Sequence, residues 1–142
     1  MRHNVSLDGG GGHAPGAQSP LLDISNSMVR LYKDTFGRGP TKARSQFSGP
    51  DTLVVLLENT MTVAERRLVE IGEYSRVREH RLFLQLTIED RKRAEVERIL
   101  SRRTVASICG IDPRRDVAAE IFTLEPTAEV PEDGALAPSA TP

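Results

Sequence analysis

The segments LYKDTFGRGP (residues 31–40) and TLVVLL (residues 52–57) decide the fold of this chain. Apolar residues recur at three- and four-residue steps over residues 22–36, which predicts an amphipathic helix. Gly37 then supplies the left-handed residue with which a helix commonly ends. Residues 53–57 are apolar on both faces of a strand, so we expect helices to cover one side and another strand or subunit to meet the other.

Composition places the chain among ordinary globular proteins. Its 142 residues, 38% hydrophobic and 27% charged, fit one domain with tails, and a net charge of -1 gives no general attraction to nucleic acid or anionic lipid. Cys109 is the only cysteine and no charged-then-apolar leader opens the chain, so we expect a cytoplasmic protein. No apolar run approaches the length of about 20 residues that spans a bilayer. We therefore expect it to reach a membrane only through a partner.

Composition also divides the chain into a domain and two tails. Residues 1–21 include a run of four glycines and have little apolar surface to bury, which predicts a disordered tail. Residues 127–142 are rich in proline, alanine and acids and predict a second disordered tail. The ordered domain is therefore expected at residues 22–126.

Strand patterns in this domain come in pairs. Residues 43–47 and 52–58 flank a turn and predict a first hairpin, and residues 104–111 and 117–124 predict a second. With the helices described below, the order is α-β-β-α-α-β-β. We expect an α+β fold, in which the two hairpins form a four-stranded antiparallel sheet with helices on one face.

A short helix should begin at a capping box. The hydroxyl of Thr62 can accept the backbone N–H of Glu65, while the glutamate side chain reaches back to the backbone of Thr62. We expect Val63, Leu68 and Ile71 to face the core from this helix.

Residues 74–101 predict one long helix, with a strand at residues 82–88 as the alternative. The length of the pattern and oppositely charged residues four apart over residues 89–97 favour the helix. Arg81 and Lys92 interrupt its apolar stripe, so we expect their stems to lie along apolar surface and the charges of this helix to be solvated.

The glycines after the first helix invite comparison with a phosphate-binding loop. Such a loop lies after a strand and before a helix, whereas residues 37–42 lie after a helix and before a strand. The basic residues of this turn, Arg38, Lys42 and Arg44, are instead candidates for contact with an anion or an interaction partner.

No set of residues predicts catalysis, a cofactor or a metal. His80 has no aligned relay partner, Asp51 and Glu58 have no matched acid or base, and Cys109 is expected to be a buried, unreactive thiol. The arginines of residues 62–103 alternate with acids and the chain has few aromatic residues, which argues against nucleic-acid binding. We therefore expect that the protein is not an enzyme. The alternatives are a regulatory domain that binds nucleic acid or a small ligand, and an enzyme of unrecognised class.

Several segments together resemble the MpsC family of small bacterial proteins. They are the helix end at residues 32–40, the strand at residues 53–57, the capping box at residues 61–65, and the basic residues at 76–78 and 102–105. The resemblance covers residues 22–125. The family is named for a sodium-translocating, membrane-potential-generating system that is linked to inorganic carbon uptake.

The resemblance implies a role but no catalytic residues. It suggests an accessory or regulatory protein that binds a membrane transport subunit of a bicarbonate uptake system. Separately, a domain this small buries limited apolar surface, and its central strand is apolar on both faces. We therefore also expect a homodimer.

Overall fold

The computed structural model describes residues 4–5 and 19–127. Its elements, in chain order, are β1 (Asn4–Val5), α1 (Pro20–Phe36), β2 (Lys42–Phe47), β3 (Thr52–Glu58), α2 (Val63–Glu70), α3 (Tyr74–Thr87), α4 (Glu89–Leu100), β4 (Thr104–Asp112) and β5 (Val117–Leu124).

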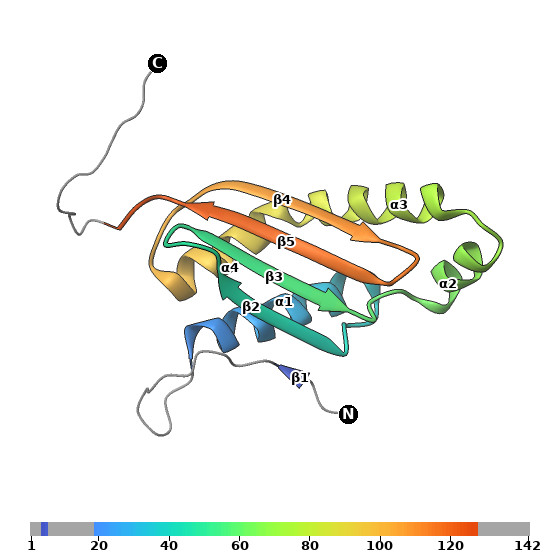
Figure 1. The fold of residues 1–142 in the computed structure, drawn as a ribbon, viewed down its shortest axis with the longest axis horizontal. Helices are drawn as coiled ribbons and strands as arrows, with labels where there is room; N and C mark the ends of the chain where they lie inside the picture. The colour runs from blue at the N-terminus through green and yellow to red at the C-terminus, as the bar shows by residue number, and fades with distance from the viewer. Residues whose placement is uncertain (1–3, 6–18, 128–142) are drawn as a thin grey trace, which may run out of the picture.

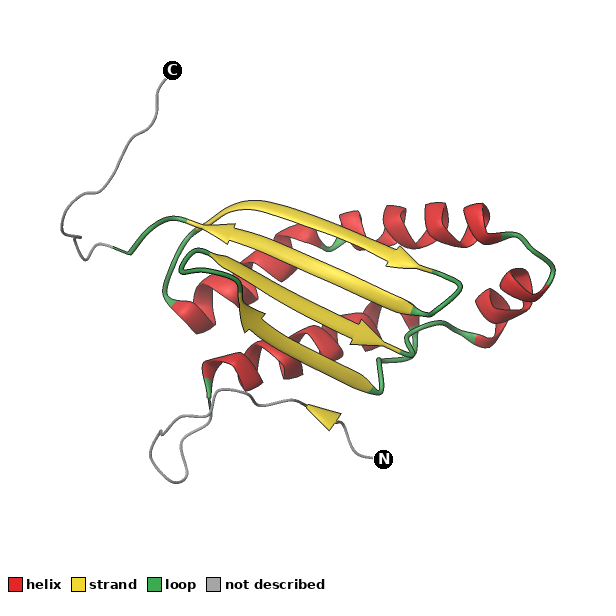
Figure 2. Cartoon of the chain, in the orientation of Figure 1, coloured by secondary structure: helices red, strands yellow, loops and turns green. Residues whose placement is uncertain are grey.

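The strands form one sheet in the order β1-β2-β3-β5-β4. Strands β2, β3, β5 and β4 pair antiparallel to one another, and the helices α1, α3 and α4 lie behind them (Figures 1 and 2). The predicted α+β fold and element order are confirmed, with the long third helix divided into α3 and α4. The helix α2 lies beyond the end of the sheet (Figure 1).

The edge strand β1 falls within the segment that was predicted to be a disordered tail. Asn4 and Val5 pair in parallel with Lys42 and Ala43 of β2, so the prediction for residues 1–21 is wrong at these two positions. The reason is that the edge of β2 offers unpaired backbone groups. Residues 20 and 21 of the predicted tail belong to the helix α1, and residues 1–3, 6–18 and 128–142 lie outside the described residues.

The helix α1 begins two residues earlier than predicted. Ser19 caps it, with its side-chain oxygen accepting the N–H of Leu21 at 3.1 Å, and Pro20 occupies the first helical position. Ser25, on the inward side of this helix, is buried and hydrogen-bonded to Ser45 of β2 at 2.7 Å. The helix ends as predicted, because Gly37 adopts φ +83°.

The core lies between the sheet and the helices. Alternate residues of β3 (Leu53, Val55 and Leu57) have no exposed surface, and they pack with α1 residues such as Met28 and Tyr32. The alternation follows from the strand period of two residues. The intervening side chains of β3 face the other side of the sheet, where no described helix lies (Figure 1).

The helix α2 has the predicted cap, but of the three residues predicted to face inward only Leu68 packs against the core. Glu65 completes the capping box with Thr62. Val63 and Ile71, expected in the core, are 71% and 72% exposed, whereas Glu65 is buried. The cause is the ion pair that Glu65 makes with Arg81, which turns the charged side of this helix toward the protein.

Residues 74–100 are helical except at Ile88, and Ser101 caps the end of α4, so the alternative strand at residues 82–88 is wrong. Ile88 leaves helical geometry with φ -112° and ψ 16°. Next to it, the Thr87 hydroxyl donates to the Leu84 carbonyl at 2.7 Å, a local bond that is known to bend helices. The interruption allows α3 and α4 to follow the sheet with different directions (Figure 1).

Candidate functional site

The three basic residues predicted as one contact do not lie together. Arg38 turns toward the start of α2, where its Nη1 donates to the Met61 carbonyl at 3.4 Å. Lys42 and Arg44 are exposed on the face of β2 that the helices leave open. Because these two are i and i+2 on a strand, they share a face, whereas Arg38 belongs to the preceding turn.

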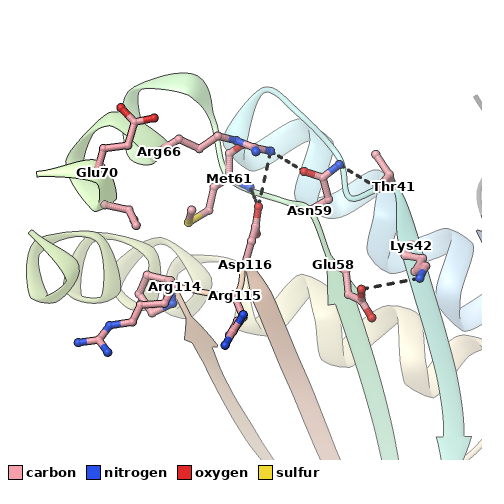
Figure 3. A pocket seen from close by; sticks show the side chains of 12 residues that line it. Thr41, Lys42, Glu58, Asn59, Met61, Arg66, Glu70, Arg114, Arg115 and Asp116 are labelled. Carbon is pink, nitrogen blue, oxygen red and sulfur yellow. Dashed lines mark hydrogen bonds and ion pairs between the residues drawn. The ribbon is translucent and has the colours of Figure 1, made fainter. Parts of the chain in front are cut away.

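A hollow of about 610 Å³ lies at the end of the sheet, where β3 leads into α2 and the β4–β5 hairpin turns (Figure 3). We call it the basic hollow, after the four cationic side chains that line it. These are Lys42, Arg66, Arg114 and Arg115. Three carboxylates, from Glu58, Glu70 and Asp116, also line it.

Two residues in left-handed backbone conformation hold the rim of the basic hollow. Asn59 has φ +61° and Asp116 has φ +56°, and the N–H of Asn59 donates to the Asp116 carbonyl at 3.0 Å. The Asp116 carboxylate accepts the N–H groups of Thr60 at 2.8 Å and Met61 at 3.1 Å. Hydrogen bonds to a charged acceptor offset the cost of these backbone conformations, about 1–2 kcal/mol each. The rim is therefore fixed.

The cations of the basic hollow differ in how they are neutralised. Arg66 lies 3.7 Å from Asp116, and Lys42 lies 3.9 Å from Glu58. Figure 3 shows Arg66 also joined to the Asn59 side chain, which in turn donates to Thr41.

Within the described part of the chain, the two hairpin arginines have no carboxylate partner. Arg114 is exposed and places its guanidinium carbon 4.1 Å from the centre of the Tyr74 ring, a cation–π contact. The exposed side chain of Arg115 makes no ion pair with any described residue. The basic hollow therefore keeps two positive charges available to an incoming anion.

Sequence reasoning found only Lys42 among these four cations. The missed residues come from α2 and from the hairpin turn, far apart along the chain, so only the fold brings them together. One local signal existed, because Arg114 and Arg115 occupy a turn, where long charged side chains are exposed.

The second feature is the open face, which we define as the side of β2, β3, β5 and β4 that is turned away from the helices. Its side chains form three aligned rows: Lys42, Glu58, Val117 and Asp112; Arg44, Leu56, Ala119 and Gly110; and Gln46, Val54, Ile121 and Ile108. The centre of this face is apolar, β2 contributes its basic edge, and Asp112 lies at the opposite edge.

A buried polar network lies on the opposite, helix-covered side of the sheet. Lys92 and Glu120 form an ion pair at 2.7 Å with side chains 1% and 0% exposed. Tyr32 donates to the same carboxylate at 2.7 Å, and Gln85 donates to the Tyr32 hydroxyl at 2.7 Å. Burial raises the pKa of Glu120, although Lys92 and the hydrogen bonds lower it, and burial also raises the pKa of Tyr32.

A second buried ion pair joins α2 to α3. Arg81, with no exposed surface, donates to Glu65 at 2.9 and 2.8 Å and to the Thr60 carbonyl at 2.6 Å. Its guanidinium carbon lies 3.8 Å from the centre of the Phe36 ring. Burial would raise the pKa of Glu65, but the hydrogen bonds from Arg81 and Thr62 lower it. The expectation that Arg81 and Lys92 keep their charges in solvent is therefore wrong.

The remaining residues considered for catalysis are engaged elsewhere or lie apart. His80 is half-exposed, 3.5 Å from Glu65, and Asp51 pairs with Arg102. Burial raises the pKa of the Cys109 thiol. Within residues 4–5 and 19–127, no group of three or more His, Cys, Asp or Glu side chains is placed to hold a metal ion. No helix in this part of the chain has the length and apolar character to cross a bilayer.

Comparison with known proteins identifies the family. No curated protein and no solved structure matches the chain. A family model described as "Na+-translocating membrane potential-generating system (MpsC)" matches residues 21–126, which contain every element from β2 to β5 and nearly all of α1. The chain therefore belongs to the MpsC family.

Proposed function

We propose that this protein is an accessory or regulatory subunit of a Na⁺-translocating, membrane-potential-generating system, and that it acts by binding a membrane subunit of that system from the cytoplasmic side. The family description names the system. The observation that carries the proposal is the pair of exposed arginines at the rim of the basic hollow. We extend the proposal to bicarbonate uptake as the transport process served.

Charge in the basic hollow favours an acidic ligand. Arg66 and Lys42 already face carboxylates, but Arg114 and Arg115 have none. A guanidinium binds a carboxylate through two parallel hydrogen bonds, so two neighbouring arginines favour a segment that carries more than one acid. The net charge of the whole chain is -1, so this preference is local to the hollow.

Rigidity of the rim adds to the preference. The backbone around the hollow is fixed by the Asp116 carboxylate and by two left-handed residues, so binding does not have to order it. A volume of about 610 Å³ accommodates several side chains of a peptide segment. We therefore propose that the ligand is an acidic segment of the membrane subunit.

The test is capture of the tagged full-length protein from detergent-solubilised membranes of its own host, with identification of the captured proteins by mass spectrometry. We expect a membrane subunit of a Na⁺-translocating system with the unchanged protein, and loss of most of it with Arg114→Glu/Arg115→Glu. The matched control is Arg76→Glu/Arg78→Glu, which makes the same charge change on exposed residues of α3.

Two outcomes contradict the proposal. One is capture that contains no membrane transport subunit. The other is equal loss with both double variants, which would show a response to net charge and not to the basic hollow. Circular dichroism of each variant checks that the fold is unchanged.

A further inference from the structure

We propose that a second copy of this chain packs on the open face, related by a two-fold axis that runs parallel to the strands between β3 and β5. The proposal is independent of the membrane partner. It starts from the polarity of the face. An antiparallel sheet that faces water on one side normally carries polar residues there.

The centre of the open face is apolar across three strands. Val54 of β3 pairs with Ile121 of β5, which pairs with Ile108 of β4, and Ile108 is 58% exposed. Leu56 and Ala119 form the neighbouring pair. Contiguous apolar surface of this kind marks an interaction site.

The register of the strands identifies the partner as a second copy. A two-fold axis between β3 and β5 places β2 of one copy over β4 of the other, and β3 over β5. Each row of one copy then lies over the same row of the other copy, with the order of the four strands reversed. In the first row, Lys42, which also lies 3.9 Å from Glu58 of its own chain, then faces the partner's Asp112, and the contact occurs twice. The basic edge of the face thereby meets the acidic corner of the same face.

The sizes of the facing side chains also fit the two-fold axis parallel to the strands. In the second row, Leu56 lies over the partner's Ala119 and Arg44 lies over the partner's Gly110, so each large residue meets a small one. In the third row, Val54 lies over the partner's Ile121. Alternation of large and small residues is what allows two faces to interdigitate.

The other in-plane axis, perpendicular to the strands, is disfavoured by charge. It places β2 over β2 of the second copy, so the basic residues Lys42 and Arg44 of the two copies come close together. Like charges that face each other at an interface are costly. The charge pattern therefore selects the axis parallel to the strands.

The size of the face indicates the strength of the contact. The seven residues of β3 span about 24 Å and four strands span about 19 Å, so two copies bury about 900 Å² together. This area lies below the usual range of stable interfaces, about 1,200–2,000 Å². We therefore expect a dimer that dissociates on dilution in the micromolar range.

The first experiment measures the mass of the full-length protein across micromolar concentrations by sedimentation velocity. We expect twice the chain mass of 15.6 kDa at the upper end. Ile121→Lys should weaken the dimer by at least about tenfold, because it places a charge in the apolar centre. Phe83→Lys is the matched control, since Phe83 is 69% exposed on α3 and should leave the dimer unchanged. A monomer at every concentration, or equal effects of both variants, would overturn the proposal.

The second experiment tests the axis by cross-linking in a Cys109→Ser background. Two proteins, one with Lys42→Cys and one with Asp112→Cys, are treated with a short bismaleimide linker, alone and mixed. We expect the dimer band mainly in the mixture, because Lys42 of one copy faces the partner's Asp112. Linkage of Lys42→Cys alone, without enrichment in the mixture, would refute this axis.

Discussion

Replacement of Lys92 by methionine tests the buried polar network most directly. Lys92 Nζ lies 2.7 Å from Glu120 Oε1, and neither side chain has more than 1% of its surface exposed. Methionine keeps most of the apolar stem, so the variant removes the charge and leaves the packing nearly intact. Glu120 then keeps only its hydrogen bonds from Tyr32 and Gln85.

The expected cost is large compared with the stability of a small domain. Removal of one partner from a buried ion pair typically costs about 3–5 kcal/mol, because the other charge remains buried without compensation. The free energy of unfolding of such domains is about 5–15 kcal/mol. Lys92→Met should therefore remove about a fifth or more of the free energy of unfolding at pH 7.

The cost should depend on pH. Burial already raises the pKa of Glu120, and loss of Lys92, which lowers it, raises it further. A folded-state pKa above the ordinary value of 4.5 means that folding favours the protonated form, so stability falls as the pH rises above 4.5. The deficit of Lys92→Met should accordingly be largest near neutral pH and shrink toward pH 4.

The assay is urea unfolding followed by far-ultraviolet circular dichroism, at one protein concentration, for Lys92→Met, Glu120→Gln and the double variant. We expect the double variant to be less destabilised than the sum of the two single variants by at least about 2 kcal/mol, because it leaves no unpaired charge. A cost for Lys92→Met below about 1 kcal/mol, or the same cost in the Glu120→Gln background, would refute the assignment of a buried ion pair.

Three further variants test other parts of the fold. Arg81→Leu should cost about 3–5 kcal/mol in urea unfolding, because it leaves Glu65 buried without a cation; a loss under 1 kcal/mol would contradict this. Gly37→Ala should cost about 1–2 kcal/mol by conformational strain alone, since φ is +83° and no atom lies within 4 Å of an added Cβ, so an unchanged unfolding midpoint would show that the helix end rearranges. The Glu95 pKa is lowered to about 2 by hydrogen bonds, chiefly from Arg98, so its carboxylate stabilises the fold above pH 4.5 and this contribution is lost as the pH falls toward 2. Glu95→Gln should therefore be less stable than the unchanged protein by about 0.5–1 kcal/mol at pH 7 and equally stable near pH 2; a difference that persists at pH 2 would point to another cause.

Local sequence signals predicted the elements well because each depends on a few adjacent residues. Gly37 ends α1, and Thr62 with Glu65 begins α2, as their spacing indicates. Strand patterns on either side of two turns predicted the two hairpins. The break at Ile88 was not predicted, because it depends on one side-chain bond and on how the two halves pack against the sheet.

Buried charges were missed because their partners are distant in sequence. Lys92 and Glu120 are separated by 28 positions and Tyr32 and Glu120 by 88, so no local pattern joins them. A signal was nevertheless present. Glu120 alternates with Phe122 on the inward side of β5, and Lys92 shares a helical stripe with Val96, so two opposite charges occupied expected core positions.

The candidate contact was predicted only in part for a similar reason. Proximity in sequence grouped Arg38 with Lys42 and Arg44, but Arg38 belongs to the preceding turn and points toward Met61, while the other two share a face of β2. The basic hollow instead gathers Lys42 with Arg114 and Arg115, which the fold brings to the same end of the sheet. Only the sheet order could have revealed this.

Each side of the sheet departs from the usual polarity, because the apolar core side contains a buried ion pair and the open side has an apolar centre. The bond from Lys92 to Glu120 has a fixed partner and direction and holds α4 at a defined position under the sheet, while the bonds from Arg81 to Glu65 hold α2 against α3. The outward side carries apolar residues that no described helix covers. Substitutions on the two sides should therefore have different effects. Lys92→Met should lower the free energy of unfolding, while the folded molecules still dimerise. Ile121→Lys should weaken dimerisation and leave the buried ion pairs intact.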